Sequence, residues 1–224
     1  IWLAGGLVDG GADASITTSR GKWSSVVASD GLPDGYAVGM SVNNAWDVGV
    51  FIEGGTLLNS KGGDIFIAGA QSTSSLSGYA HIALKNGARV DSGTGRIAMW
   101  GRALAGTSNW SQGIILNWDD NTTPVVVSSN ATTSDAITVY SDSQAGAACS
   151  RGITGWWHGI WSASRGYQGS QILATGLGGG ITLTGLGSTS TSCSGGDGWG
   201  VNIEFADVLA KSGPITVNAI GNSN

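Results

Sequence analysis

Hydrophobic residues recur along the chain in short alternating stretches and not at helical spacing. Six stretches share one pattern, in which an Ile is followed by a second apolar residue two positions later and by Gly, Ala or Ser four positions later: IWLAG (Ile1), IFIAG (Ile65), IAMWG (Ile97), ITVYS (Ile137), ITLTG (Ile181) and ITVNA (Ile215). Alternate side chains of a strand share a face, so the two apolar residues of each stretch point the same way. Turn-forming Gly, Ser, Asn or Asp residues bound each stretch. The pattern predicts an all-β chain of short strands joined by tight turns.

The sequence before these stretches also repeats. Two positions before the Ile stands a glycine in four cases and an aspartate in a fifth: Gly63, Gly95, Gly179, Gly213 and Asp135. Gly adopts positive φ freely and Asp tolerates it better than most residues, so we expect a corner here. Further upstream, GVFIEGG, AHIALKNG and WGVNIEFA each predict another strand, and Leu58, Val90 and Val208 mark a strand between these and the corner. The unit is therefore strand, strand, corner, strand and then a polar insertion of variable length.

The spacing of the Ile residues is irregular, at 64, 32, 40, 44 and 34 residues. Because the first interval is twice the second, we expect a degraded copy between Ile1 and Ile65. The best match is GYAVGMS at 35–41, with Ala37 and Gly39 in the apolar positions.

Three short strands cannot enclose a core, but stacked units can, because each inward residue then lies above its equivalent in the next turn. The repeat predicts a parallel β-helix (β-solenoid) of about six irregular turns, with residues 1–224 as a single segment. A β-propeller would need four strands in blades of similar length, and a sandwich would show no in-register repeat. We expect Ile65, Ile97, Ile181 and Ile215 with their i+2 partners to form one buried column, and Phe66, Ala98, Thr182 and Thr216 to face outward.

Composition and charge narrow the possible partners. The chain has 39 glycines but only three prolines, 41% hydrophobic residues, and a formal net charge of −5. With no cluster of Lys or Arg, nucleic acid is not expected as a partner. No apolar run approaches the ~18 residues of a membrane-spanning helix, so membrane insertion is not expected either.

Three longer stretches carry a family resemblance. VDSGTGRIAMWG, GGGITLTGLG and GVNIEFADVLAKSGPITVNAIG resemble repeats of the large secreted bacterial adhesins of the filamentous-haemagglutinin type, over residues 48–105 and 170–221. The resemblance implies a right-handed β-helical segment of a long exported protein, located extracellularly or on the cell surface. It also implies a structural role, in adhesion or filament building. The units here are longer and less regular than the repeats of that family.

The two cysteines occupy equivalent positions. Cys149 lies 12 residues after Ile137 and Cys193 lies 12 residues after Ile181. In-register turns would place them about 4.8 Å apart along the axis, which suits the ~4.4–6.8 Å Cα separation of a disulfide. An exported protein also permits such a bond. We expect a Cys149–Cys193 disulfide; the alternative is two unpaired thiols in unrelated insertions.

Catalytic and metal-binding patterns are lacking in the sequence. The one adjacent acidic pair, Asp119 and Asp120, lies in NWDDNTT, where Asn, Asp and Thr favour a solvated turn. His81 and His158 are isolated from other metal ligands, and no phosphate-binding glycine motif occurs. We therefore expect no enzyme, no metal and no cofactor. The alternative is a carbohydrate-active β-helix protein, with Asp119 and Asp120 as its acids.

Aromatic residues gather in one insertion. Of the ten tryptophans, GWWHGIWSASRGYQG holds three together with a tyrosine: Trp156, Trp157, Trp161 and Tyr167. These rings could stack on sugar rings as a glycan-binding platform, or they could pack against the flank of the solenoid. An ice- or surface-binding solenoid is disfavoured because a convincing Thr-x-Thr pair occurs once, at Thr182 and Thr184.

Both ends of the sequence match the interior of a repeat. IWLAGG corresponds to the third strand of a unit, so we expect Ile1 and Leu3 to point inward, and ITVNAIG completes a unit near Asn224. Neither end carries a polar segment that would cap an apolar cross-section. We expect that the segment continues into further solenoid turns or stacks end to end on copies of itself.

Overall fold

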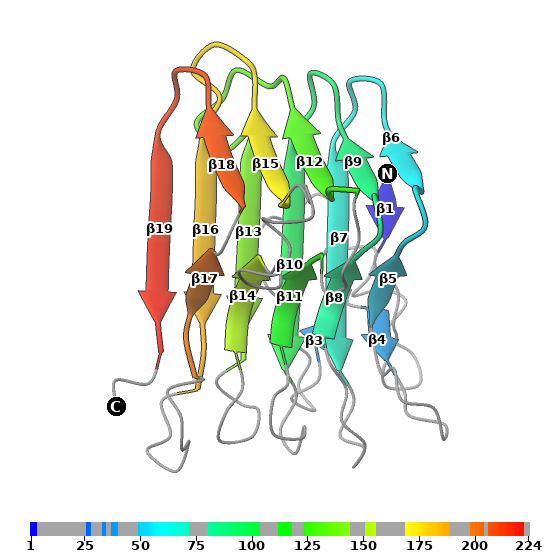
Figure 1. Cartoon of the computed structure of the whole chain (residues 1–224), viewed down its shortest axis with the longest axis vertical. Helices are drawn as coiled ribbons and strands as arrows, with labels where there is room; N and C mark the ends of the chain where they lie inside the picture. The colour runs from blue at the N-terminus through cyan, green and yellow to red at the C-terminus, as the bar shows by residue number, and fades with distance from the viewer. Residues whose placement is uncertain are drawn as a thin grey trace.

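The computed structural model describes residues 1–3, 26–27, 33–34, 37–39, 49–71, 80–103, 112–117, 123–143, 151–155, 169–188, 198–203 and 206–221. Within these residues all regular structure is β, and three parallel sheets stack into a β-solenoid (Figure 1). The predicted fold class is therefore confirmed. We call the sheets 1, 2 and 3, in the order in which each turn of the chain visits them.

Each sheet contains one strand from every turn. Sheet 1 contains β5 (Val50–Ile52), β8 (Ala80–Leu84), β11 (Gln112–Leu116), β14 (Arg151–Gly155) and β17 (Val201–Ile203). Sheet 2 contains β6 (Leu57–Asn59), β9 (Arg89–Asp91), β12 (Val126–Ser129), β15 (Gln171–Ala174) and β18 (Asp207–Ala210). Sheet 3 contains β7 (Ile65–Gln71), β10 (Ile97–Ala103), β13 (Ile137–Asp142), β16 (Ile181–Leu186) and β19 (Ile215–Ile220), together with β1 (Trp2–Leu3) and β4 (Ala37–Gly39). A separate antiparallel pair joins β2 (Val26–Val27) to β3 (Pro33–Asp34).

The described strands make five complete turns, which we call coils 1 to 5, and not the six expected. Coil 1 is β5–β6–β7 and coil 5 is β17–β18–β19. The sixth copy of the Ile pattern, at Ile1, supplies only β1, a third strand with no described first or second strand before it. Counting the copies of one strand therefore overestimated the number of turns.

The strands of sheet 3 align at the predicted positions. Ile65 pairs with Ile97, Ile97 with Ile137, and onward through Ile181 to Ile215 in one column. The first four members of this column are fully buried in the core. Burying one such side chain stabilises a fold by roughly 1.5–3 kcal/mol. A second column runs along sheet 2 through the predicted Leu58, Val90 and Val208.

The predicted extra copy between Ile1 and Ile65 is wrong. Strand β1 pairs directly with β7, with Trp2 opposite Phe66 and Leu3 opposite Ile67, so no turn separates them. The predicted strand at Ala37 does form, as β4, but it aligns with Gly69 and not with Ile65. Because β1 already occupies the first half of the β7 edge, only the second half is left for β4.

The outer face of sheet 3 is less exposed than its position suggests. Thr182 is half-buried and Thr216 is exposed, but Phe66 and Ala98 are buried. The ring of Phe66 contacts the ring of Trp100 edge to face, with centroids 5.0 Å apart. Alternation along the strand still directs these side chains away from the core column, as expected.

The glycines before the Ile residues serve a different purpose from the one predicted. The positive φ values near these corners belong to Lys61, Gly62, Gly93 and Gly178 and not to the expected Gly63, Gly95, Gly179 and Gly213. A Cβ on Gly95 would instead overlap the carbonyl group of Gly63, in the coil before it. Close stacking on the preceding coil, and not backbone conformation, therefore requires glycine at Gly95, Gly179 and Gly213, whereas a Cβ on Gly63 would make an ordinary contact at 3.7 Å.

Small residues four positions after the Ile mark the contact between sheets 3 and 1. Gly69, Gly101, Ser141, Gly185 and Ala219 form one column across five strands of sheet 3. A Cβ on Gly185 would overlap the carbonyl oxygen of Gly200, which directly precedes β17 of sheet 1, and one on Gly69 would overlap that of His81 in β8. The two sheets thus touch backbone to backbone along this corner, which we call the 3–1 corner.

Candidate functional site: the exposed face of coil 5

The core columns become exposed at coil 5. Ile181 and Leu183 are 0% and 1% exposed, whereas the residues paired with them, Ile215 and Val217, are 46% and 48% exposed. Ile203 in sheet 1 is 42% exposed. The prediction that Ile215 belongs to a buried column is therefore correct for its alignment and wrong for its burial. Nothing in the sequence distinguishes Ile215 from Ile181, because both stand in the same repeat.

All three strands of coil 5 lie at the edge of their sheets. Strands β17, β18 and β19 are each last in the strand order, and β19 closes one end of the solenoid (Figure 1). Among the described residues, each of these strands has a neighbour on one side only. The outer edge of such a strand presents unpaired N–H and C=O groups, which favour the addition of another strand. We call this surface the coil-5 face, made of the three strands with Ile203, Val208, Ala210, Ile215 and Val217.

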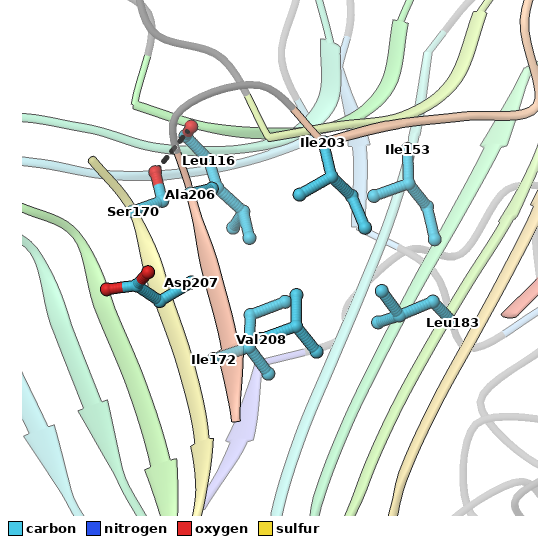
Figure 2. A pocket seen from close by; sticks show the side chains of 9 residues that line it. All are labelled: Leu116, Ile153, Ser170, Ile172, Leu183, Ile203, Ala206, Asp207 and Val208. Carbon is cyan, nitrogen blue, oxygen red and sulfur yellow. Dashed lines mark hydrogen bonds between the residues drawn. The ribbon is translucent and has the colours of Figure 1, made fainter. Parts of the chain in front are cut away.

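A cavity opens beneath the coil-5 face. Its empty volume is about 270 Å³, including space open to solvent, and its lining includes Ile153, Leu183 and Val208. Figure 2 shows these side chains pointing toward one another, with the Ser170 hydroxyl at the rim donating to the Leu116 carbonyl at 2.8 Å. The lining is mainly aliphatic, which does not favour binding of a polar ligand.

The cavity has a cause in the sequence. One sheet 1 column runs through Ile52, Leu84, Leu116, Gly155 and Ile203, so coil 4 contributes a glycine where the other coils contribute Leu or Ile. Leu116 and Ile203, on either side of this glycine, both line the cavity. The missing side chain accounts for the gap in the core.

At the opposite end of the solenoid β1 covers part of β7, and the core residues Ile65 and Ile67 of coil 1 are 0% exposed. Leu3 packs against the core cluster, as predicted, whereas Ile1 is partly exposed. The N-terminal ammonium group donates a hydrogen bond to the carbonyl oxygen of Asp64 at 2.8 Å. Phe51 and Leu57 in coil 1 are exposed as well.

One ion-pair ladder joins coils 1 to 3 on the outside of the corner between sheets 2 and 3. The guanidinium of Arg96 lies 3.0 Å from a carboxylate oxygen of Asp64 and 3.0 Å from one of Asp135. Partial burial alone would raise the pKa of Asp64, but hydrogen bonds from the backbone and side chain of Arg96 outweigh it and lower that pKa. The pKa of Asp135 is lowered in the same way against burial, by hydrogen bonds from Thr133 and Arg96. The ladder thus stabilises the stacking of three coils.

The predicted disulfide lies outside the described residues, as both Cys149 and Cys193 do. Described residues close to the two segments belong to consecutive coils at the 3–1 corner, where the Ser143 N–H donates to the Leu186 carbonyl at 2.7 Å. The bond remains a prediction, and alkylation of the native protein before and after reduction tests it. Labelling of both thiols without reductant would contradict the bond.

The candidate acids and the aromatic cluster also lie outside the described residues. Asp119 and Asp120 belong to segment 118–122, whereas Trp156, Trp157, Trp161 and Tyr167 belong to segment 156–168. The described strands that precede the two segments, β11 and β14, are paired neighbours, with Leu116 opposite Gly155. The two segments therefore follow paired strands of consecutive coils.

The described residues contain no group of three or more His, Cys, Asp or Glu side chains that could hold a metal ion. His81 is fully buried, and this burial lowers the pKa of its imidazole to about 3. Its ring is therefore neutral at physiological pH. In the part of the chain that the structure covers, no helix is long and apolar enough to cross a membrane.

The comparisons with known proteins give no assignment. No family model matches the sequence, and neither a curated protein nor a solved structure matches it. A functional proposal therefore rests on the β-solenoid scaffold and on its exposed coil-5 face.

Proposed function

We propose that this chain is a structural segment of an extracellular adhesin or filament, extended by the addition of β-coils to the coil-5 face. The observation that carries the proposal is the loss of burial along a continuous column, from 0% exposure at Ile181 to 46% at Ile215. One more coil would restore both the burial and the strand pairing that coils 2 to 4 have.

The energetic gain from extension is substantial. Ile203, Ile215 and Val217 are each close to half exposed. Since complete burial of such a side chain is worth roughly 1.5–3 kcal/mol, covering the three would contribute about 3 kcal/mol. The hydrogen bonds of three strand edges would add to this gain.

Extracellular location and adhesion rest on the resemblance of the repeats to filamentous-haemagglutinin-type adhesins. The solenoid scaffold is consistent with this structural role, because a long coil holds its two ends apart. Such a role requires no catalytic site. Antibodies against the chain should label intact cells that produce it. Labelling only after the cells are lysed would contradict the proposed location.

Assembly in solution tests the extension itself. We expect the wild-type chain to form larger species as its concentration rises, measured by sedimentation velocity. Val217→Lys places a charge on the coil-5 face and should suppress this assembly. Thr216→Lys is the matched control, because it adds the same charge to the outer face of the same strand. Equal suppression by both variants, or no assembly at all, would contradict end-to-end addition.

Glycan binding is a second candidate function. It is favoured because segments 118–122 and 156–168 follow paired strands of consecutive coils, which gives acidic and aromatic residues adjacent starting points. We expect retention of the chain on insoluble polysaccharides, with loss of retention in a Trp156→Ala, Trp157→Ala variant. Release of reducing sugar that depends on Asp119 and Asp120 would instead favour the enzyme. Unchanged retention in the tryptophan variant would remove this candidate.

A further inference from the structure

We propose that the coil-5 face accepts a β-coil of this same repeat and selects it by requiring glycine at the 3–1 corner. The inference rests on the proposed function and specifies the chemistry of the incoming coil. The occupant is a parallel three-stranded coil whose third strand continues the Ile215 and Val217 columns.

The interface that such a coil would form already exists inside the molecule. Strands β16 and β19 pair through six consecutive positions, from Ile181–Ile215 to Leu186–Ile220. Every described coil meets the next in this register on sheet 3. A sixth coil would repeat this contact, with an apolar-x-apolar third strand placed on Ile215 and Val217.

The selective element is the backbone contact between sheets 3 and 1. The glycines of the sheet 3 column each face the first-strand segment of the following coil. A Cβ on Gly101 would lie 2.8 Å from the carbonyl oxygen of Gly113, and one on Gly185 would overlap that of Gly200. Ala219 occupies this position in coil 5, so it would face the first strand of a sixth coil.

The sheet 1 side of the corner is built from glycine in three consecutive coils. Gly113 and Gly152 take the same register position in β11 and β14, and Gly200 directly precedes β17, just before the Ile153–Val201 pair. A Cβ on Gly152 would overlap the carbonyl oxygen of Gly200, and one on Gly200 would lie 2.6 Å from the backbone nitrogen of Ile220. The incoming residue that continues this position would stand to Ala219 as Gly200 stands to Gly185, and a Cβ on Gly200 would overlap the Gly185 carbonyl oxygen. By this repeat the incoming residue has room for a hydrogen atom and not for a side chain.

Ser141 shows how much the sheet 3 side tolerates. It has a Cβ in the same column as Ala219, and the residue facing it in its own coil is Gly113. A single small side chain is thus accommodated when glycine stands opposite. Ala219 fits this rule, whereas a β-branched residue at position 219 would exclude the incoming strand.

The experiment extends the full chain by one coil. A second copy of residues 187–221 is joined after Asn224, and amide hydrogen exchange of β19 is compared with that of the unextended chain. We expect exchange in β19 to slow by about tenfold or more on extension. The slowing should persist with Ala219→Gly in the first copy and disappear with Ala219→Val. In the unextended chain both substitutions should leave the unfolding midpoint unchanged, because β19 is exposed there.

The outcomes separate the two proposals. Slowing that survives Ala219→Val would overturn the corner rule and leave end-to-end extension standing. No slowing in any extended chain would overturn both. Strong protection of β19 in the dilute, unextended chain would mean that the face is already occupied, which also overturns the inference.

Discussion

Gly113→Ala tests the contact between sheets 3 and 1 within one coil. A Cβ on Gly113 would coincide with the hydroxyl oxygen of Ser141 and lie 2.7 Å from the Ser141 Cβ. The next obstacle is the carbonyl oxygen of Gly152, at 2.8 Å. The main clash is therefore with a side chain, and a second substitution, Ser141→Gly, can remove it.

The magnitudes follow from the burial of both residues. Overpacking of a closed core costs about 1–3 kcal/mol, so Gly113→Ala alone should destabilise the protein by that amount. The Ser141 hydroxyl is buried and has no hydrogen-bond partner among the described residues, so Ser141→Gly also removes an unfavourable group. That gain, about 1–3 kcal/mol, offsets the ~0.5–1 kcal/mol conformational cost of a new glycine in a strand. We expect a coupling of about 1–2 kcal/mol between the two sites.

Urea unfolding of the two single variants and the double variant, followed by circular dichroism, measures this coupling. Gly152→Ala is the control, because its Cβ would overlap the Gly200 carbonyl and lie 3.0 Å from the Gly185 Cα, both backbone. Ser141→Gly should therefore rescue Gly113→Ala in large part and Gly152→Ala not at all. Additive effects of Gly113→Ala and Ser141→Gly would refute the contact between Gly113 and Ser141 at this corner.

Three further substitutions test the core, the ion-pair ladder and the cavity. Ile97→Asp buries an unpaired charge and should cost more than about 4 kcal/mol, so an unchanged melting curve would rule out the column. The pKa values of Asp64 and Asp135 are lowered in the folded state. The two carboxylates therefore contribute their full share of folding stability above the unfolded pKa near ~4, and this stability is lost as pH falls through the folded pKa values. Arg96→Gln should thus destabilise the chain by less than about 1 kcal/mol at pH 7 in urea unfolding and by nothing at low pH; an equal effect at both would argue against the ladder. Gly155→Leu places a side chain in the column where coil 4 has none, and it should raise the midpoint of thermal unfolding by filling the cavity. A lower midpoint would show that the cavity is not the space left by the missing side chain at position 155.

Period-two alternation and in-register repeats were sufficient to predict the solenoid. The Ile pattern located β1 and the third strand of all five coils correctly, because the same physical requirement, an inward column, acts on every copy. The assignment of GYAVGMS to a missing turn failed because strand pairing depends on the edge that is free, and β1 had occupied half of the β7 edge. The spacing of residues in the sequence does not show that β1 and β4 compete for the same edge of β7.

The role of glycine was predictable in position but not in cause. Gly95 stands where a corner was expected. Glycine is required there by the close contact with Gly63 in the neighbouring coil and not by a positive φ. Likewise, the exposure of Ile215 could not be predicted, because burial depends on whether a further coil covers the strand. The ladder through Arg96 was missed for a related reason: its partners are 32 and 39 residues away and become neighbours only through stacking.

Electron cryomicroscopy of the assembled chain tests the central claim most directly. If coils add to the coil-5 face, the particles should elongate along the solenoid axis, with strands perpendicular to it and a continuous repeat of about 4.8 Å along it. That repeat should continue across each junction between chains, with β19 paired to a strand of the next unit. Particles in which chains associate side by side, leaving β19 exposed at every end, would contradict the account.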